Sequence, residues 1–204
     1  MHKGPRLIKA VRECPRITVK GVWYRSVDGE VFRHFYHPTK PMRPLWGLGA
    51  PAGGARFTPK NGPSSLYLAE DLETANREGL QATAGTPVKP PAGVTRAVYT
   101  VKVELTDIID LRDDSVGLSL GTSAAELGGP WRYRRDKKTA PTQRLGRIAA
   151  KVGAEGLLFQ STKHTGGCLV VFIGNVRSTS FLEVSDSSRL LERIPPGGTS
   201  VGGS

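Results

Sequence analysis

Alternating apolar and polar residues mark several half-buried β-strands along the chain. Residues 17–27 are rich in β-branched and aromatic side chains and end at an Asp-Gly turn signal. Residues 64–69 and 94–111 alternate residue by residue, which is typical of a strand with one face in the core. Two apolar runs, 156–161 and 168–173, flank a glycine-containing loop. We interpret these two runs as a pair of buried strands.

Two further segments carry apolar residues at helical spacing. Residues 72–84 begin after two acidic residues, which favour a helix N-terminus, and end before Gly85. Their predicted apolar stripe consists of Leu72, Ala75, Gly79 and Ala82. Residues 141–152 begin with a proline and are followed by a glycine, the usual start and stop signals of a helix. The pattern therefore predicts an α+β fold with five or six mostly antiparallel strands and two or three short helices.

The same pattern divides the chain into three parts. Residues 1–16 are basic and lack a clear period, so we predict a flexible lead-in. Residues 17–184 form the folded domain, in which 37–54 and 112–140 are expected to be long loops, the second with one short helix. Residues 185–204 are expected to form a weak helix and a disordered glycine-rich tail. A chain of 204 residues is long enough for one well-buried core and short for two full domains.

The charge of the chain restricts its partners. The formal net charge is +11, so the surface attracts anions such as nucleic acid, acidic protein or phosphorylated small molecules. The basic residues are spread along the chain, with the densest group at 132–138, rather than repeated along one helix face. This distribution favours a solvated face or a surface for an acidic partner over a nucleic-acid groove.

Cysteine usage and hydropathy indicate a reduced, cytoplasmic compartment. Cys14 and Cys168 are far apart, and neither has a companion at metal-ligand spacing. No apolar segment of signal-peptide length follows the basic amino terminus. The longest apolar run, 168–173, is too short to span a bilayer. We therefore expect a protein with no membrane partner.

Two candidate chemistries have weak support in the sequence. His34 and His37 could lie on one helix face, but Pro38 follows at once and no third ligand is near, so we expect no metal site. Ser161 lacks the small-residue elbow of a hydrolase nucleophile and has only His164 as a nearby base. A hydrogen-bonding role at the end of a strand is the better interpretation of Ser161.

A third group of polar residues, Arg56, Tyr67 and Glu78, is spaced at intervals of eleven positions. An arginine binds phosphate through two parallel charged hydrogen bonds, a tyrosine offers a flat ring, and a carboxylate stabilises developing positive charge. Glu78 lies about 60° from Ala75 around the predicted helix, on the margin of its apolar stripe. Taken singly, each residue also has a structural interpretation: a loop-anchoring ion pair, an edge-strand aromatic and a solvated helix residue.

Four short motifs, in this order, resemble the RES-domain family: Gly54-Ala55-Arg56-Phe57, Leu66-Tyr67-Leu68-Ala69-Glu70, Glu73-Thr74-Ala75 leading to Glu78, and Gly156-Leu157-Leu158-Phe159-Gln160-Ser161. The arginine, glutamate and serine that give the family its name map onto Arg56, Glu78 and Ser161. The resemblance covers residues 22–175 and identifies 17–184 as a RES-like catalytic domain. The family's active-site tyrosine maps onto Tyr67, and the arginine of an early aromatic strand onto Arg25.

The resemblance implies a fold related to ADP-ribosyltransferase toxins and an activity on NAD. It also implies a toxin whose cognate antitoxin is a helix-turn-helix protein that covers the active site. The chain departs from the family pattern after Arg56, where Phe57 and Thr58 replace tryptophan and asparagine. It departs again at Phe159-Gln160-Ser161, with Lys163 in place of arginine, where the family often has Tyr-Pro-Ser.

These residues can share the work of splitting NAD, which is a substrate here rather than a cofactor. Cleavage of the nicotinamide–ribose bond passes through an oxocarbenium-like ribose that a carboxylate can stabilise, and Glu78 is our candidate. Arg56 and Arg25 would neutralise the pyrophosphate, and Tyr67 would pack against the nicotinamide or its ribose. Ser161 would orient the substrate, and Tyr24, beside Arg25, is a further candidate binding residue.

Three functions remain open at this point. The first is a growth-inhibiting toxin that acts as an NAD glycohydrolase or phosphorylase until its antitoxin neutralises it. The second is a mono-ADP-ribosyltransferase that modifies a protein target. The third, from another class, is a non-catalytic basic module that binds nucleic acid, although we do not expect direct nucleic-acid binding. No residue in the sequence decides whether water, phosphate or a protein accepts the ADP-ribose.

Overall fold

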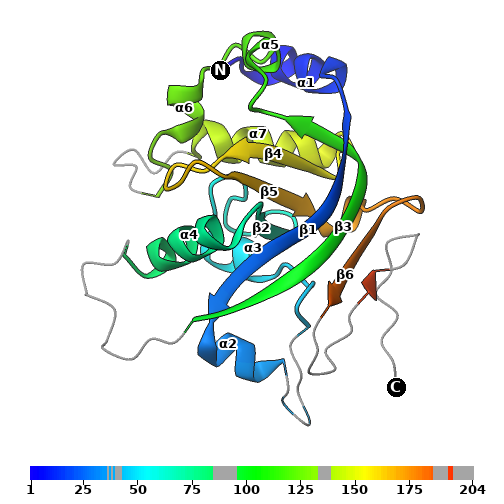
Figure 1. Ribbon diagram of the computed structural model, residues 1–204. Coiled ribbons are helices and arrows are strands. Elements are labelled where there is room, and N and C mark those ends of the chain that lie inside the picture. The colour runs from blue at the N-terminus through cyan, green and yellow to red at the C-terminus, as the bar shows by residue number, and fades with distance from the viewer. Residues whose placement is uncertain are drawn as a thin grey trace.

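The computed structural model describes residues 1–35, 37, 39, 43–84, 96–132, 139–185 and 193–194. Two long strands, β1 (Ile17–Asp28) and β3 (Arg96–Asp110), run side by side across the molecule (Figure 1). The other strands are β2 (Ser65–Ala69), β4 (Gly156–Gln160), β5 (Gly167–Phe172), β6 (Phe181–Ser185) and β7 (Arg193–Ile194). The helices are α1 (Gly4–Glu13), α2 (Gly29–His34), α3 (Gly49–Gly53), α4 (Leu72–Ala84), α5 (Asp114–Ser119), α6 (Ala124–Gly128) and α7 (Pro141–Lys151).

The described strands form one sheet in the order β1-β2-β5-β4-β3-β6-β7. Because β1 pairs with β3 as well as with β2, five of these strands close into a ring. The β3–β4 pair is parallel, and every other pair is antiparallel. The predicted α+β fold with a mostly antiparallel sheet is therefore confirmed.

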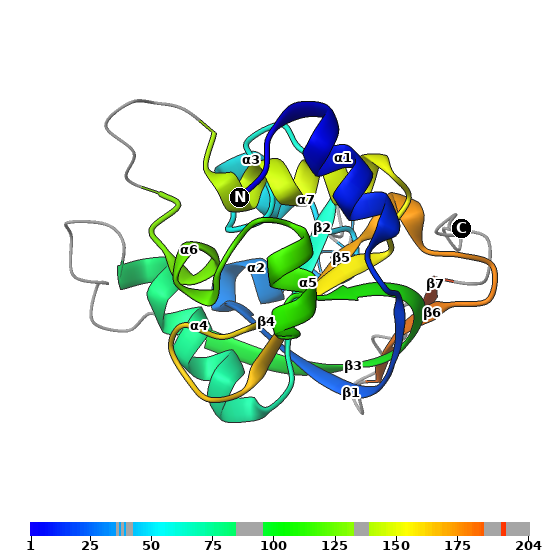
Figure 2. The same ribbon diagram turned by 90° about the horizontal axis from the view of Figure 1, so that it is seen from above.

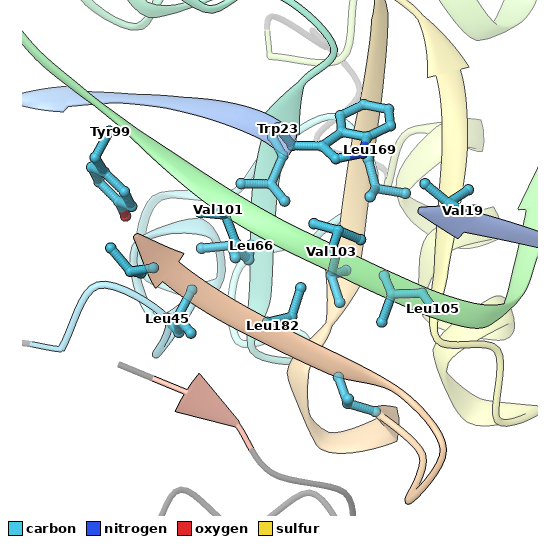
Figure 3. Close-up of a cluster of buried hydrophobic side chains, with 14 of the residues drawn as sticks. Val19, Trp23, Leu45, Leu66, Tyr99, Val101, Val103, Leu105, Leu169 and Leu182 are labelled. Atoms are coloured by element: carbon cyan, nitrogen blue, oxygen red, sulfur yellow. The ribbon is translucent and has the colours of Figure 1, made fainter. Parts of the chain in front are cut away.

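Alternation along the strands separates two buried clusters, one on each face of the sheet. Leu66 and Leu68 of β2 join the first cluster, while Tyr67 between them packs against the second. The first cluster also takes the inward side chains of β1, β3 and β6, some of which are drawn in Figure 3. The face that carries Tyr67 is thus opposite to the one that carries its neighbouring leucines, as the period of two requires.

The helices α1 and α7 cover the second face. They contact each other, and they lie together at the end of the molecule where α5 and α6 are found (Figure 1). The predicted flexible lead-in is wrong for residues 4–13, because α1 packs Leu7 and Val11 into this cluster with no exposed surface. The four positions between these two apolar residues place them on one face of a helix, a signal too short to stand out in a basic segment.

Several short elements were not predicted. The helix α2 precedes the predicted loop at 37–54, and α3 lies within that loop. The described part of the segment 112–140 contains two short helices, α5 and α6, rather than one. The strands β6 and β7 lie on the far side of the sheet from α4, as both views show (Figures 1 and 2).

On α4, Leu72 is 51% exposed and so does not belong to the buried stripe that was predicted. Most of the predicted C-terminal helix and tail, 186–192 and 195–204, lies outside the described residues.

No helix in the described part of the chain is long and apolar enough to cross a membrane. The predicted boundaries of the folded domain, 17–184, stay a prediction.

Candidate active site

A pocket of about 770 Å³ opens beside α4, between the loop that precedes β2 and the segment that follows α6. Five of its described lining residues carry positive charge, namely Arg25, Arg56, Arg96, Arg132 and Lys163. One carboxylate, that of Glu78, lies among the described residues of the wall. A pocket with this balance attracts a polyanion and offers a single acidic group to a neutral or cationic part of it.

Glu78 extends from the middle of α4, and its carboxylate is held by a serine. The hydroxyl of Ser161 donates a hydrogen bond of 2.6 Å to Glu78 Oε1. Ser161 is 6% exposed, and its Oγ accepts hydrogen bonds from the backbone N–H groups of Lys163 and His164. These two donors fix the hydroxyl so that its proton faces the carboxylate. Ser161 is therefore placed to orient Glu78, which agrees with a hydrogen-bonding role.

The helix α4 approaches β1 closely because residue 79 is a glycine. A methyl group at Gly79 would lie 2.4 Å from Ser26 Oγ, well inside van der Waals contact. The absence of a side chain at this position lets the adjacent Glu78 stand at the wall of the pocket.

Arg56 is oriented by backbone carbonyls at the end of α6 and directly after it. Its Nη1 donates to the carbonyls of Leu127 and Gly129 at 2.8 and 3.0 Å, and Nη2 donates to Thr162 Oγ1 at 3.3 Å. No described residue accepts from Nε, so one edge of the guanidinium retains donors for a ligand in the pocket. Burial lowers the pKa of Arg56, and Glu78 opposes that shift.

The hydroxyl group of Tyr67 holds the loop that carries Arg56. The phenolic oxygen accepts a 2.9 Å hydrogen bond from the Phe57 backbone N–H and lies 2.9 Å from Thr58 Oγ1. Burial also raises the pKa of the Tyr67 hydroxyl well above its ordinary value. The hydroxyl is thus engaged and protonated, which leaves the ring of Tyr67 as the part that a substrate can contact.

Helix α7 supports the same loop from the other side. Gln143 Nε2 donates to the Ala55 carbonyl at 3.0 Å. A methyl group at Gly146 would lie 1.8 Å from the Phe57 carbonyl oxygen, so the helix and the loop backbone are in direct contact. Gly54, with φ of 78°, adopts the left-handed conformation that starts the loop.

Arg25 and Tyr24 line the pocket where β1 and β2 separate. The two strands pair at Tyr24 and Ala69, and beyond this point Arg25 Nη1 donates to the Tyr67 carbonyl at 3.0 Å. A side chain thus replaces a backbone partner at the point where the strands diverge. The Nε of Arg25 is buried and has no hydrogen-bond partner among the described residues.

All six site residues predicted from the sequence therefore lie in or next to one pocket: Tyr24, Arg25, Arg56, Tyr67, Glu78 and Ser161. Their individual roles stay predictions. The sequence analysis missed Arg96, Trp131, Arg132, Lys163 and Cys168, which also line the pocket. Arg96 looked like an ordinary polar position of an alternating strand, and Trp131 is carried by a segment whose course no local pattern indicated.

Cys168 lies in the pocket wall on the face of β5 that points toward Phe159. Burial, followed by the nearby Glu78 charge, raises the pKa of the Cys168 thiol to about 12. The sulfur is therefore a neutral thiol at physiological pH rather than a nucleophilic thiolate.

Comparison with known proteins identifies a family and a solved structure to which the chain is similar. The model of a family described as the RES domain matches residues 22–189. The crystal structure of the MbcT–MbcA toxin–antitoxin complex from M. tuberculosis contains a chain of similar fold, with a TM-score of 0.69 and 17% sequence identity. That alignment covers 94% of this chain and 92% of the other. No curated protein matches the chain.

Proposed function

Because this chain belongs to the RES-domain family, we propose that it is an NAD-consuming toxin that breaks the bond between nicotinamide and ribose. The observation that carries the proposal is the single carboxylate of Glu78, held by Ser161 in a pocket whose other charged residues are all basic among those described. NAD combines a cationic nicotinamide ribose with an anionic pyrophosphate, and the pocket offers groups of opposite charge to both.

The carboxylate of Glu78 stabilises the transition state. As the C1′–N bond breaks, its electron pair leaves with the nicotinamide nitrogen, and positive charge spreads over C1′ and the ring oxygen of the ribose. Glu78 Oε1 is held by Ser161, so Oε2 is the oxygen available to a ribose hydroxyl. A carboxylate fixed before the reaction needs no reorganisation as the charge develops.

The arginines hold the pyrophosphate. Arg56 presents the edge of its guanidinium that no described residue occupies, and Arg25 lines the same pocket. Charged N–H groups bind phosphate oxygens in parallel pairs, which fixes both distance and direction. The ring of Tyr67 then packs against the nicotinamide or its ribose, and Tyr24 lines the adjoining wall. These steps require no cofactor and no metal ion.

The released ADP-ribosyl group is captured by an oxygen or nitrogen nucleophile. Capture by water gives ADP-ribose and a proton, and capture by phosphate gives a phosphorylated ADP-ribose, so the enzyme would be a glycohydrolase or a phosphorylase. A mono-ADP-ribosyltransferase that modifies a protein is the second candidate, because the same bond cleavage leaves an ADP-ribosyl group that a protein side chain can accept.

The similar chain of known structure comes from a toxin–antitoxin complex, which supports a cognate antitoxin as partner. We propose that the antitoxin is a helix-turn-helix protein, that it neutralises growth inhibition, and that both proteins are cytoplasmic. We propose neither a membrane partner nor direct binding of nucleic acid.

Incubation of the purified, antitoxin-free protein with NAD tests the proposal. Free nicotinamide without modified protein indicates hydrolysis or phosphorolysis, whereas labelled protein indicates transfer. No loss of NAD under these conditions would reject both enzymes. Steeply salt-dependent binding of DNA or RNA that is insensitive to Arg56 and Glu78 substitutions would instead support a non-catalytic binding module.

A further inference from the structure

Arg96, the first residue of β3, faces the pocket next to Arg25 of β1. Its Nε donates to Ser26 Oγ at 2.9 Å, and its Nη2 donates to the Ser26 carbonyl at 3.0 Å. Because Ser26 follows Arg25 in the chain, both guanidinium groups are attached to the same short stretch of β1. Gly79 lies against Arg96, since a methyl group at this glycine would be 2.8 Å from Arg96 Nε.

The two positive charges lie near each other, with the carboxylate of Asp28 also nearby. Neither Arg25 nor Arg96 forms an ion pair with a described residue. Burial lowers the pKa of Arg96, Asp28 partly opposes this, and the charge of Arg25 lowers the pKa further. Binding of an anion between two like charges is favourable, because the anion relieves their mutual repulsion.

One N–H group of these two arginines has no hydrogen-bond partner among the described residues. The Nε of Arg25 is buried, and no described residue accepts a hydrogen bond from it. Buried donors in folded proteins are nearly always satisfied, so the Arg25 guanidinium carries more donors than the described residues use.

Arg25 is bonded to the backbone carbonyl of Tyr67, and Arg96 is bonded to Ser26 of β1. The guanidinium of Arg56 is bonded instead to Leu127, Gly129 and Thr162. The two cationic groups are thus held by different elements of the pocket lining.

We propose that Arg25 and Arg96 form an anion site of their own, which binds a single phosphate group and is distinct from the site at Arg56. Its chemistry fits a phosphate of the dinucleotide or a free inorganic phosphate equally well. The identification of the phosphate as part of NAD rests on the proposed function, but the anion site itself does not.

Calorimetric titration with inorganic phosphate tests the site without NAD. We expect Arg96→Gln and Arg25→Gln each to weaken binding about 10- to 100-fold, as the loss of a charge-assisted contact does. Arg96→Lys keeps the positive charge but loses the parallel N–H donors of the guanidinium. It should therefore weaken binding less than Arg96→Gln does. Lys102→Gln is the matched control, because Lys102 lies on the same strand, is exposed and is paired with Glu183. Its affinity should equal that of the wild type.

NAD turnover then distinguishes the two sources of phosphate. If Arg96→Gln raises the KM for NAD about tenfold in phosphate-free buffer with little change in kcat, the site holds a phosphate of the substrate. If it changes only the response to added inorganic phosphate, the site holds the free anion.

Folded Arg96→Gln and Arg96→Lys proteins that bind inorganic phosphate like the wild type would overturn the proposal and reduce Arg96 to a structural partner of Ser26. Wild-type protein that binds inorganic phosphate through Arg96 but leaves NAD intact would instead reject the proposed function and retain the anion site.

Discussion

Ser161 and Glu78 lie 83 positions apart in the chain, yet the serine hydroxyl donates a 2.6 Å hydrogen bond to the glutamate carboxylate. The bond joins the loop after β4 to the middle of α4. It connects two of the three residue types after which the RES domain is named, and the third, Arg56, is bonded to Thr162, the neighbour of Ser161. The three residues thus form one connected group, and the tertiary structure rather than the sequence spacing brings them together.

Replacement of Glu78 by glutamine should lower kcat for nicotinamide release by about 100-fold or more, because one preorganised transition-state contact loses its charge. The fold should be retained, since the amide has the same shape. Nicotinamide release can be followed by chromatography. Glu73→Gln is the matched control, because Glu73 is exposed on the same helix and pairs with Arg77. Full activity in a folded Glu78→Gln protein would refute the assignment.

Ser161→Ala should lower kcat about tenfold and leave KM for NAD within a few-fold of the wild type. The substitution removes the hydrogen bond that orients Glu78 but removes no charge. Steady-state kinetics on the folded variant would measure kcat and KM separately. A much larger loss, equal to that of Glu78→Gln, would point instead to a direct chemical role for the hydroxyl.

Tyr67→Phe should loosen the loop that carries Arg56. The Phe57 backbone N–H would lose its acceptor, at a cost of about 1–3 kcal/mol in the free energy of unfolding. We expect KM for NAD to rise several-fold in addition. Tyr99→Phe removes a comparable buried hydroxyl, which donates to the Pro44 carbonyl outside the pocket, and should cost stability alone. Urea unfolding and kinetics on both variants would separate the two effects.

Gly146→Ala should disturb the Arg56 loop from the side of α7. The new methyl group would overlap the Phe57 carbonyl oxygen, so either the helix or the loop must move. We expect a loss of about 1–3 kcal/mol in the free energy of unfolding, with a higher KM for NAD. Gly174→Ala is the control, because no atom lies within 4 Å of its added methyl group. An unchanged melting temperature in Gly146→Ala would contradict the packing described here.

Cys168 should make the protein sensitive to alkali. Its pKa is raised to about 12 in the folded state, whereas an unfolded thiol ionises near its ordinary value of 9.0. The unfolded chain therefore loses this proton first, and the contribution to stability is complete below pH 9 and is lost progressively as the pH rises toward 12. Between pH 8 and 10.5 the free energy of unfolding should fall by about 1–2 kcal/mol more in the wild type than in Cys168→Ala. Equal slopes in urea unfolding would show that the thiol is not protected.

Much of the fold could be predicted from the sequence because its signals are local. The alternation of residues 64–69 predicted the strand β2 and the direction of Tyr67 away from its neighbouring leucines. The two acidic residues before residue 72 predicted the start of α4. The helix α1 could not be predicted with the same ease, because its stability depends on the burial of Leu7 and Val11 against α7 rather than on its basic, glycine-led sequence.

The candidate site shows the same division. By itself the sequence determined which side chains we propose to carry the chemistry, since the charge, ring and carboxylate of Arg56, Tyr67 and Glu78 belong to residues within short motifs. The tertiary structure alone decided that Ser161 holds Glu78 and that Arg96, bonded to Ser26, lines the same pocket as Arg25, because both hydrogen bonds cross between elements distant in the chain. Such contacts depend on the pairing of strands and on close approach at Gly79 and Gly146, and no local period encodes these distances.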